Sequence, residues 1–284
     1  MRRRIAIILG LFVGCISFWG TTLQILQAEN VEHENILHVN YGGMWQQDQY
    51  LSPLLYSGMR VGLGNEWWQP FRQESRLGRK GRLTNWVHTG RVDVSFGWLY
   101  NQPHSNGIYA LGIQGGWGAL YKWQFQQAGV QIWLGPYLDL DFMPRMILSN
   151  VNKPYSMDAA AQIEAMAGIS YSFAGRKTSY RLRYTVRANV IGVDFMPDYW
   201  QSYYELTEGI DGIVRCAGMW NHRYLNHELT FDMQFLHSTW RVGIRHEYLE
   251  YGQGDLWFSR EQVSAVIGTC FRYKLKPNKR LTEW

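Results

Sequence analysis

Apolar and polar positions alternate along most of the chain that follows its N-terminal segment. From Arg91 to Trp98 every second residue is apolar, and the residues between are charged, small or glycine. A period of two residues is that of a β-strand, in which successive side chains point to opposite faces. The same alternation recurs over residues 109–125, 161–173, 180–190, 228–235, 240–248 and 263–274. The pattern predicts an all-β fold whose strands each have one apolar face.

Two features of these runs favour a transmembrane barrel over a soluble β-sandwich, whose strands also alternate. The runs exceed the usual strand of about 5–6 residues, and a tilted membrane strand needs about 9–11. Aromatic residues stand at the ends of the apolar faces, as in the girdles of outer-membrane barrels. They are Trp98 with Tyr100, Trp123 with Phe125, Trp240 with Tyr248, and Phe271 with Tyr273. We therefore predict an antiparallel up-and-down transmembrane β-barrel.

The alternating runs give about ten strands, within a range of about 8–12. Short connections at 127–128, 174–177 and 237 alternate with longer ones at 101–106, 143–157 and 196–219. Outer-membrane barrels have short periplasmic turns and long external loops, so both chain ends are expected in the periplasm. Segment 69–82 is long for such a turn, and missed strands there would make about twelve. The predicted strands lie near 36–45, 56–68, 83–100, 107–126, 128–142, 158–174, 178–195, 220–236, 238–251 and 260–275.

Residues 1–28 have the features of a secretory signal peptide. Three arginines at positions 2–4 precede an apolar run over 5–19, and we place the cleavage after Ala28. A retained membrane helix is one alternative, but the run is shorter than the roughly 20 residues that a span needs. A lipid anchor at Cys15 is another, although apolar residues continue beyond it. Residues 29–284 then form a single barrel domain in the outer membrane of a Gram-negative cell.

Charge and cysteine content narrow the possible partners. The formal net charge of +5 falls to +2 when the three signal arginines are removed, so it does not indicate a nucleic-acid partner. Cys15 leaves with the signal peptide, and the predicted topology puts Cys216 and Cys270 at opposite ends of the barrel. A disulfide needs Cα atoms within about 7 Å, so we expect two free thiols. Neither cysteine has the spacing of a metal site.

The polar faces of the strands carry paired charges that would point into the lumen. In the hairpin that turns at His237, Asp232 lies opposite Arg241 and Glu228 lies opposite Arg245. Such cross-strand pairs are favourable by about 0.2–1 kcal/mol. The network is expected to comprise Arg181, Arg183, Arg187, Glu164, Glu228, Asp232, Arg241 and Arg245, joined by Arg91, Asp93, Asp139 and Asp141. A lumen of about ten strands is narrow, so we favour a structural salt-bridge network over an anion-selective constriction or a ligand site.

The segment from His104 to Gly107 is the only candidate for catalysis that the sequence offers. It resembles the active-site segment of outer-membrane acyl hydrolases such as phospholipase A and lipid A deacylase, which use a His and a Ser two residues apart. Here His104 and Ser105 are adjacent and would point to opposite faces of a strand. Turn residues are the simpler explanation. We predict no enzyme, no metal site and no cofactor.

The C-terminal part resembles a family of uncharacterised outer-membrane barrels from Bacteroides-type bacteria. The similarity rests on residues 226–232, 241–249 and 271–275. This resemblance implies location and fold, and it assigns no activity. We expect a barrel with a filled or narrow lumen, outer-membrane lipid around it, and the barrel-assembly machinery as its partner during insertion. We expect the protein to have a structural role or to act through its loops. The second alternative is a porin-like channel for small solutes, and the third is an acyl hydrolase.

Overall fold

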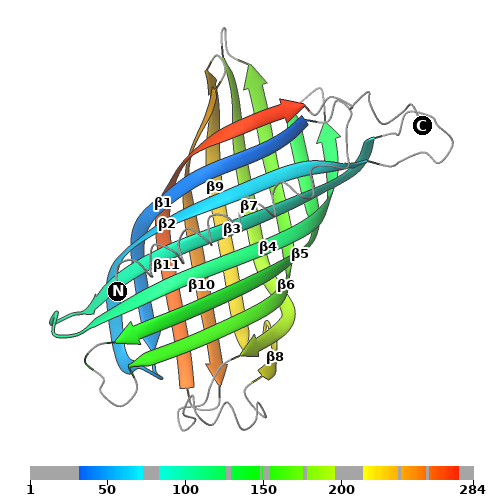
Figure 1. Cartoon of the computed structure of the whole chain (residues 1–284). Helices are drawn as coiled ribbons and strands as arrows, with labels where there is room; N and C mark the ends of the chain where they lie inside the picture. Colours follow the sequence, from blue (N-terminus) through cyan, green and yellow to red (C-terminus); the bar gives the residue numbers. More distant parts are fainter. Residues whose placement is uncertain are drawn as a thin grey trace, which may run out of the picture.

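The chain forms eleven β-strands in the residues that the computed structural model describes (Figure 1). Those residues are 32–72, 83–125, 129–147, 149, 154–174, 178–195, 214–235, 238–253 and 256–274. The predicted signal peptide and residues 73–82 lie outside them. No helix in these ranges is long and apolar enough to cross a membrane. The strands are β1 Glu32–Asp48, β2 Ser52–Arg72, β3 Leu83–Asn101, β4 Gly107–Phe125, β5 Val130–Ile147, β6 Tyr155–Ala174, β7 Ser179–Phe195, β8 Val214–Gly218, β9 His222–Phe235, β10 Ser238–Gln253 and β11 Leu256–Lys274.

Ten of these strands close into an antiparallel barrel, as predicted. Consecutive strands pair from β1 to β7, and β9 pairs with both β7 and β10. β11 pairs with β10 and with β1, which closes the barrel. The closing register runs from Glu32 opposite Lys274 to Asp48 opposite Phe258, so the seam is paired along the whole of β1. β2 and β3 are direct neighbours. No extra strand pair therefore lies between them, and the count of twelve is wrong.

Several strands run further than the sequence pattern indicated. Residues 69–72 belong to β2 and residues 143–147 belong to β5, although both were expected in connections. Residues 214–218, expected in a loop, form β8. Strands of outer-membrane barrels can extend past the apolar band, where the outer face no longer has to be apolar. The alternation therefore fades before the strand ends.

The short strand β8 extends the line of β9 along β7. β8 pairs with β7 at Ile191–Phe195, and β9 pairs with β7 over 179–188. The buried side chain of Asn189 closes the gap between these two pairings. Its Nδ2 donates to the carbonyl oxygen of His222 at 2.6 Å, and its Oδ1 accepts from the backbone N–H of Tyr224 at 2.9 Å. One amide thus replaces two ladder hydrogen bonds.

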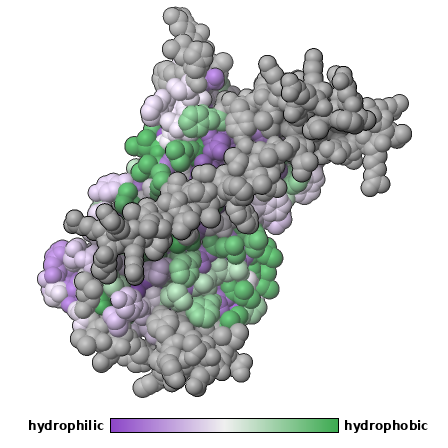
Figure 2. Space-filling view, viewed as in Figure 1, coloured by the Kyte–Doolittle hydropathy of each residue, from purple (hydrophilic) through white to green (hydrophobic). Residues whose placement is uncertain are grey.

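The distribution of polar and apolar residues is the reverse of that in a soluble protein: apolar side chains lie outside and charged ones lie inside. Outward residues such as Ile244 and Ile267 are more than half exposed, whereas Arg241 and Arg245 inside the barrel are 1% exposed. Figure 2 shows the hydrophobic residues on the outer surface of the molecule. A soluble sandwich would bury its apolar faces, so this arrangement excludes it and agrees with a barrel made for lipid.

Aromatic side chains gather toward the two ends of the outer surface. Trp86 packs edge-on against Tyr121, which in turn contacts Trp123. On the same two strands, Phe96 stacks on Tyr109 toward the opposite end. Such girdles lie at the two membrane interfaces of a barrel. The two cysteines that the structure describes are free thiols, as predicted, with Cys216 exposed and Cys270 buried.

Candidate functional site in the barrel lumen

The strands send every second side chain into the lumen, and many of these are charged or polar. All eight residues predicted for the network lie inside the barrel, together with the four that were expected to join them. Seven of the eight are buried, and the side chain of Arg181 is 14% exposed. They are stacked in layers along the barrel, each layer built from several strands.

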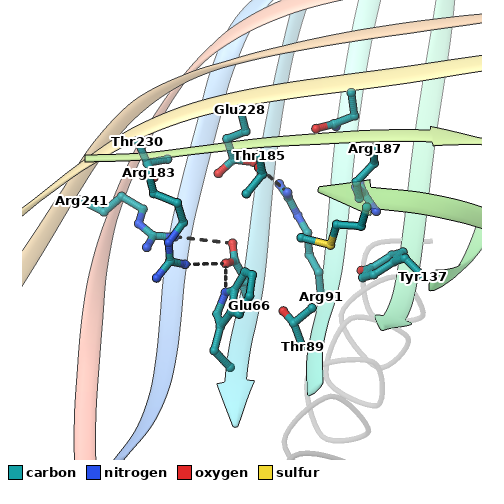
Figure 3. Close-up of a pocket in the computed structure, with 13 residues that line it drawn as sticks. Glu66, Thr89, Arg91, Tyr137, Arg183, Thr185, Arg187, Glu228, Thr230 and Arg241 are labelled. Carbon is teal, nitrogen blue, oxygen red and sulfur yellow. Dashed lines mark hydrogen bonds and ion pairs between the residues drawn. The ribbon is translucent and has the colours of Figure 1, made fainter. Parts of the chain in front are cut away.

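The first layer lies nearest the start of β1. Arg241 donates to Asp232 at 2.6 Å, across the hairpin register expected from the turn. Arg181 bridges Asp232 at 2.8 Å and Glu34 at 2.6 Å. Glu66 lies between Arg183 at 3.4 Å and Arg241 at 3.5 Å (Figure 3). This layer joins β7 to β1 and β2 across the lumen.

The second layer centres on Glu228, His38 and Asp93. Glu228 accepts from Arg245 at 2.9 Å and from Arg91 at 2.8 Å. Arg91 also donates to Asp93, which contacts the His38 ring at 3.0 Å. Arg245 closes the ring with His38 at 3.1 Å. Strands β1, β3, β9 and β10 are thereby tied together at one level.

Arg187 organises the third layer. Its guanidinium lies 3.2 Å from Asp139 and 3.5 Å from Glu164, and it packs over the ring of Tyr137. It also donates to the hydroxyl of Tyr224 at 3.2 Å. Cation–π contact with an aromatic face supplements ion pairing where water is excluded. The layer connects β5, β6, β7 and β9.

A fourth layer closes the end of the lumen near the β1–β2 turn. Arg145 lies 2.9 Å from Asp48 and also pairs with Asp158. Its guanidinium stacks 4.2 Å from the centre of the Phe258 ring, and the Tyr251 hydroxyl donates to Asp158. These side chains come from β1, β5, β6, β10 and β11, so they cross the full width of the barrel.

The two cavities described between the layers are small. A cavity of about 20 Å³ lies between the first layer and the second and third, lined by Glu66, Arg91, Tyr137, Arg187 and Glu228 among others (Figure 3). A second, of about 10 Å³, is lined by Arg60, Arg145 and Arg260 among others. A single water needs at least about 10–15 Å³. A wider hollow of about 400 Å³ lies beyond the first layer and is lined by Glu34, Gln131, Arg181 and Gln234 among others.

The arrangement is suited to holding the barrel wall together. The arginines form ion pairs between strands that are not neighbours in the sheet, such as Arg91 on β3 with Glu228 on β9. Within the described ranges no group of three His, Cys, Asp or Glu residues could hold a metal ion. Removing one partner of such a buried pair leaves an uncompensated charge, which is strongly destabilising.

The sequence pattern did not predict several residues of the network. Glu34, Asp48 and Arg145 lie beyond the strand ends that the alternation indicated. Glu66 and Arg60 lay within a predicted strand and in period with Gly62 and Gly64. The period of two could have assigned that pair to the lumen face.

The His104 segment forms a turn. Asn101 donates from Nδ2 to the Ser105 hydroxyl at 2.9 Å and accepts from the Asn106 N–H at 3.1 Å. His104 has a positive φ of 54° and its ring lies against Tyr100. The described contacts include no hydrogen bond between the His104 ring and Ser105. The turn explanation therefore accounts for these residues.

A comparison with known families matches residues 9–256 to the family described as "Protein of unknown function (DUF3316)". No curated protein matches the chain in sequence. Among solved structures, the transport unit of the autotransporter AIDA-I from Escherichia coli is 9% identical, with 88% of this chain and 92% of that chain covered and a TM-score of 0.41. The translocator domain of the autotransporter NalP from Neisseria meningitidis is 8% identical, with coverages of 94% and 98% and a TM-score of 0.35. The outer membrane protease OmpT from Escherichia coli is 7% identical, with coverages of 87% and 98% and a TM-score of 0.40. Likeness at this distance assigns no activity.

Proposed function

From the premise that the chain belongs to this family of unknown function, DUF3316, we propose that it is an outer-membrane scaffold whose lumen is closed by its charge network. The signal peptide exports it across the inner membrane of a Gram-negative cell of the Bacteroides type, and the barrel-assembly machinery inserts it. Its role is structural or depends on its external loops. It is neither an enzyme nor a solute channel.

The filled lumen is the observation that carries this proposal. Four layers of ion pairs cross the barrel, and the cavities between them are about 20 and 10 Å³. A sugar or amino acid is several times larger than a water molecule, which itself needs about 10–15 Å³. Open aqueous channels occur in barrels of about 16–18 strands. Solutes therefore do not pass through the charge network in the lumen of this barrel.

Solute uptake by liposomes tests the proposal. Vesicles that contain the folded protein are diluted into isotonic arabinose or glycine, and swelling is followed by light scattering. We expect the swelling rate of protein-free vesicles, with a general porin at equal density as the positive control. A swelling rate that rises with the amount of protein, and that differs for an Arg183→Gln/Arg187→Gln variant, would establish a channel instead.

A further inference from the structure

The wide hollow of about 400 Å³ beyond the first layer lies at the end of the barrel where β1 begins and β11 ends (Figure 1). Both chain ends are expected in the periplasm, so the mouth of the hollow faces that compartment. Pockets for small ligands have volumes of about 300–1,000 Å³. The hollow therefore has the size of a ligand site, and the first layer of ion pairs forms its floor.

The charges at the floor of the hollow are already paired. Arg181 donates to Asp232 at 2.8 Å and to Glu34 at 2.6 Å. Asp232 also accepts from Arg241 at 2.6 Å, and Glu34 also accepts from Arg183 at 2.9 Å. A charged ligand would have to displace one of these partners, and a buried charge that loses its partner is strongly destabilising. The floor therefore favours a neutral ligand.

A row of neutral polar side chains stands between this floor and the mouth. Ser179, Gln234 and Thr239 lie opposite one another on β7, β9 and β10. The row is two residues nearer the mouth than Arg181 and Asp232, which is about 6–7 Å along a strand. The Ser179 hydroxyl donates to Gln234 Oε1 at 2.5 Å. This contact uses the amide oxygen of Gln234 and leaves its two N–H groups for another acceptor.

Two further polar side chains line the hollow from β5 and β6. They are Gln131 and Ser172, and Ser172 is opposite Arg181 on β7. The described contacts give no hydrogen-bond partner to these two side chains or to the Thr239 hydroxyl. Amide and hydroxyl side chains both donate and accept hydrogen bonds. The sides of the hollow therefore offer a ligand donors and acceptors that carry no charge.

We propose that the hollow binds a neutral saccharide with hydroxyl and acetamido groups, of the kind that builds the glycan strands of the cell wall. Sugar hydroxyls both donate and accept, and an acetamido group can pair with the side-chain amides of Gln131 and Gln234. The paired floor disfavours charged ligands, and the layers behind it stop the sugar from passing further. This site rests on the closed lumen of the proposed function, which liposome swelling tests separately from saccharide binding.

Calorimetric titration of the folded barrel with tri-N-acetylchitotriose, in a detergent without a sugar headgroup, tests the site. We expect saturable binding by the wild-type protein. Gln131→Leu and Gln234→Leu each remove an amide and should raise the Kd about three- to tenfold. Ser172→Trp, at an exposed position, fills the hollow and should abolish binding. Gln69→Leu is the matched control, because Gln69 follows the lumen-lining Trp68 and so points outward at the same end of the barrel; its Kd should not change.

Sedimentation with purified cell-wall sacculi identifies the source of the sugar. We expect the wild-type barrel to sediment with them and the Ser172→Trp variant to stay in the supernatant, with heat-modifiable gel migration showing that each variant is folded. Binding of the soluble trisaccharide alone would keep the site and assign it a free saccharide. No binding of the trisaccharide by the wild-type protein up to about 10 mM, an unchanged Kd in Ser172→Trp, or equal binding of the neutral peptide N-acetyl-trialanine amide would each overturn the proposal.

Discussion

Replacement of Arg245 by methionine removes a buried charge of the second layer that has three partners. The guanidinium is 1% exposed and contacts Glu228 at 2.9 Å, His38 at 3.1 Å and Asp93 at 3.5 Å. Arg91 remains beside both carboxylates, but each loses one of its cationic partners. Loss of one partner from a buried pair costs about 3–5 kcal/mol, and we expect a fall of that size in the free energy of unfolding.

Urea titration of the barrel in dilute vesicles, followed by tryptophan fluorescence, measures this change. Glu228→Gln alone is expected to cost a similar amount, and the double variant is expected to cost less than the sum by about 0.5–3 kcal/mol. The exposed pair of Arg223 and Glu250 is the control, where Arg223→Met should cost less than about 1 kcal/mol. Additive effects of the two buried substitutions would refute the reasoning that they belong to one network.

Three further substitutions test other parts of the structure. Gly64→Ala places a methyl group 2.1 Å from an Asp93 oxygen and should cost about 1–3 kcal/mol in urea unfolding, whereas Gly115→Ala meets no atom within 4 Å and should be near neutral; equal effects would contradict the packing. Asn189→Ala removes both hydrogen bonds at the β8–β9 junction and should cost about 1–3 kcal/mol, with faster amide exchange at the strand end. Ser105→Ala should leave phospholipid and lipid A turnover by cells unchanged, and a loss of turnover would revive the acyl hydrolase.

The period of two was sufficient to predict the barrel and the inward face of most strands. It also predicted the pairing of Asp232 with Arg241 and of Glu228 with Arg245, because a short turn fixes the register of a hairpin. Pairs across the lumen could not be derived in the same way. Arg91 and Glu228 are 137 residues apart, and their meeting depends on how the closed sheet is staggered.

The ends of the strands were predicted less well for a physical reason. Hydrophobic alternation is imposed by lipid, so it marks only the part of a strand within the bilayer. Arg145 and Asp48 lie near the ends of β5 and β1, outside the alternating runs. Their pairing closes the lumen, but the outward residues around them are no longer constrained to be apolar.

Ion conductance across a planar bilayer tests the closed lumen most directly. The wild-type barrel, inserted into a bilayer in about 1 M salt where surface charges are screened, is expected to give no current steps above the bare membrane, with a general porin as the positive control for insertion and detection. Heat-modifiable gel migration of the same preparation shows that the barrel is folded. Stable unitary steps from the folded wild-type protein, altered when Arg183, Arg187 and Arg245 are neutralised, would contradict the account.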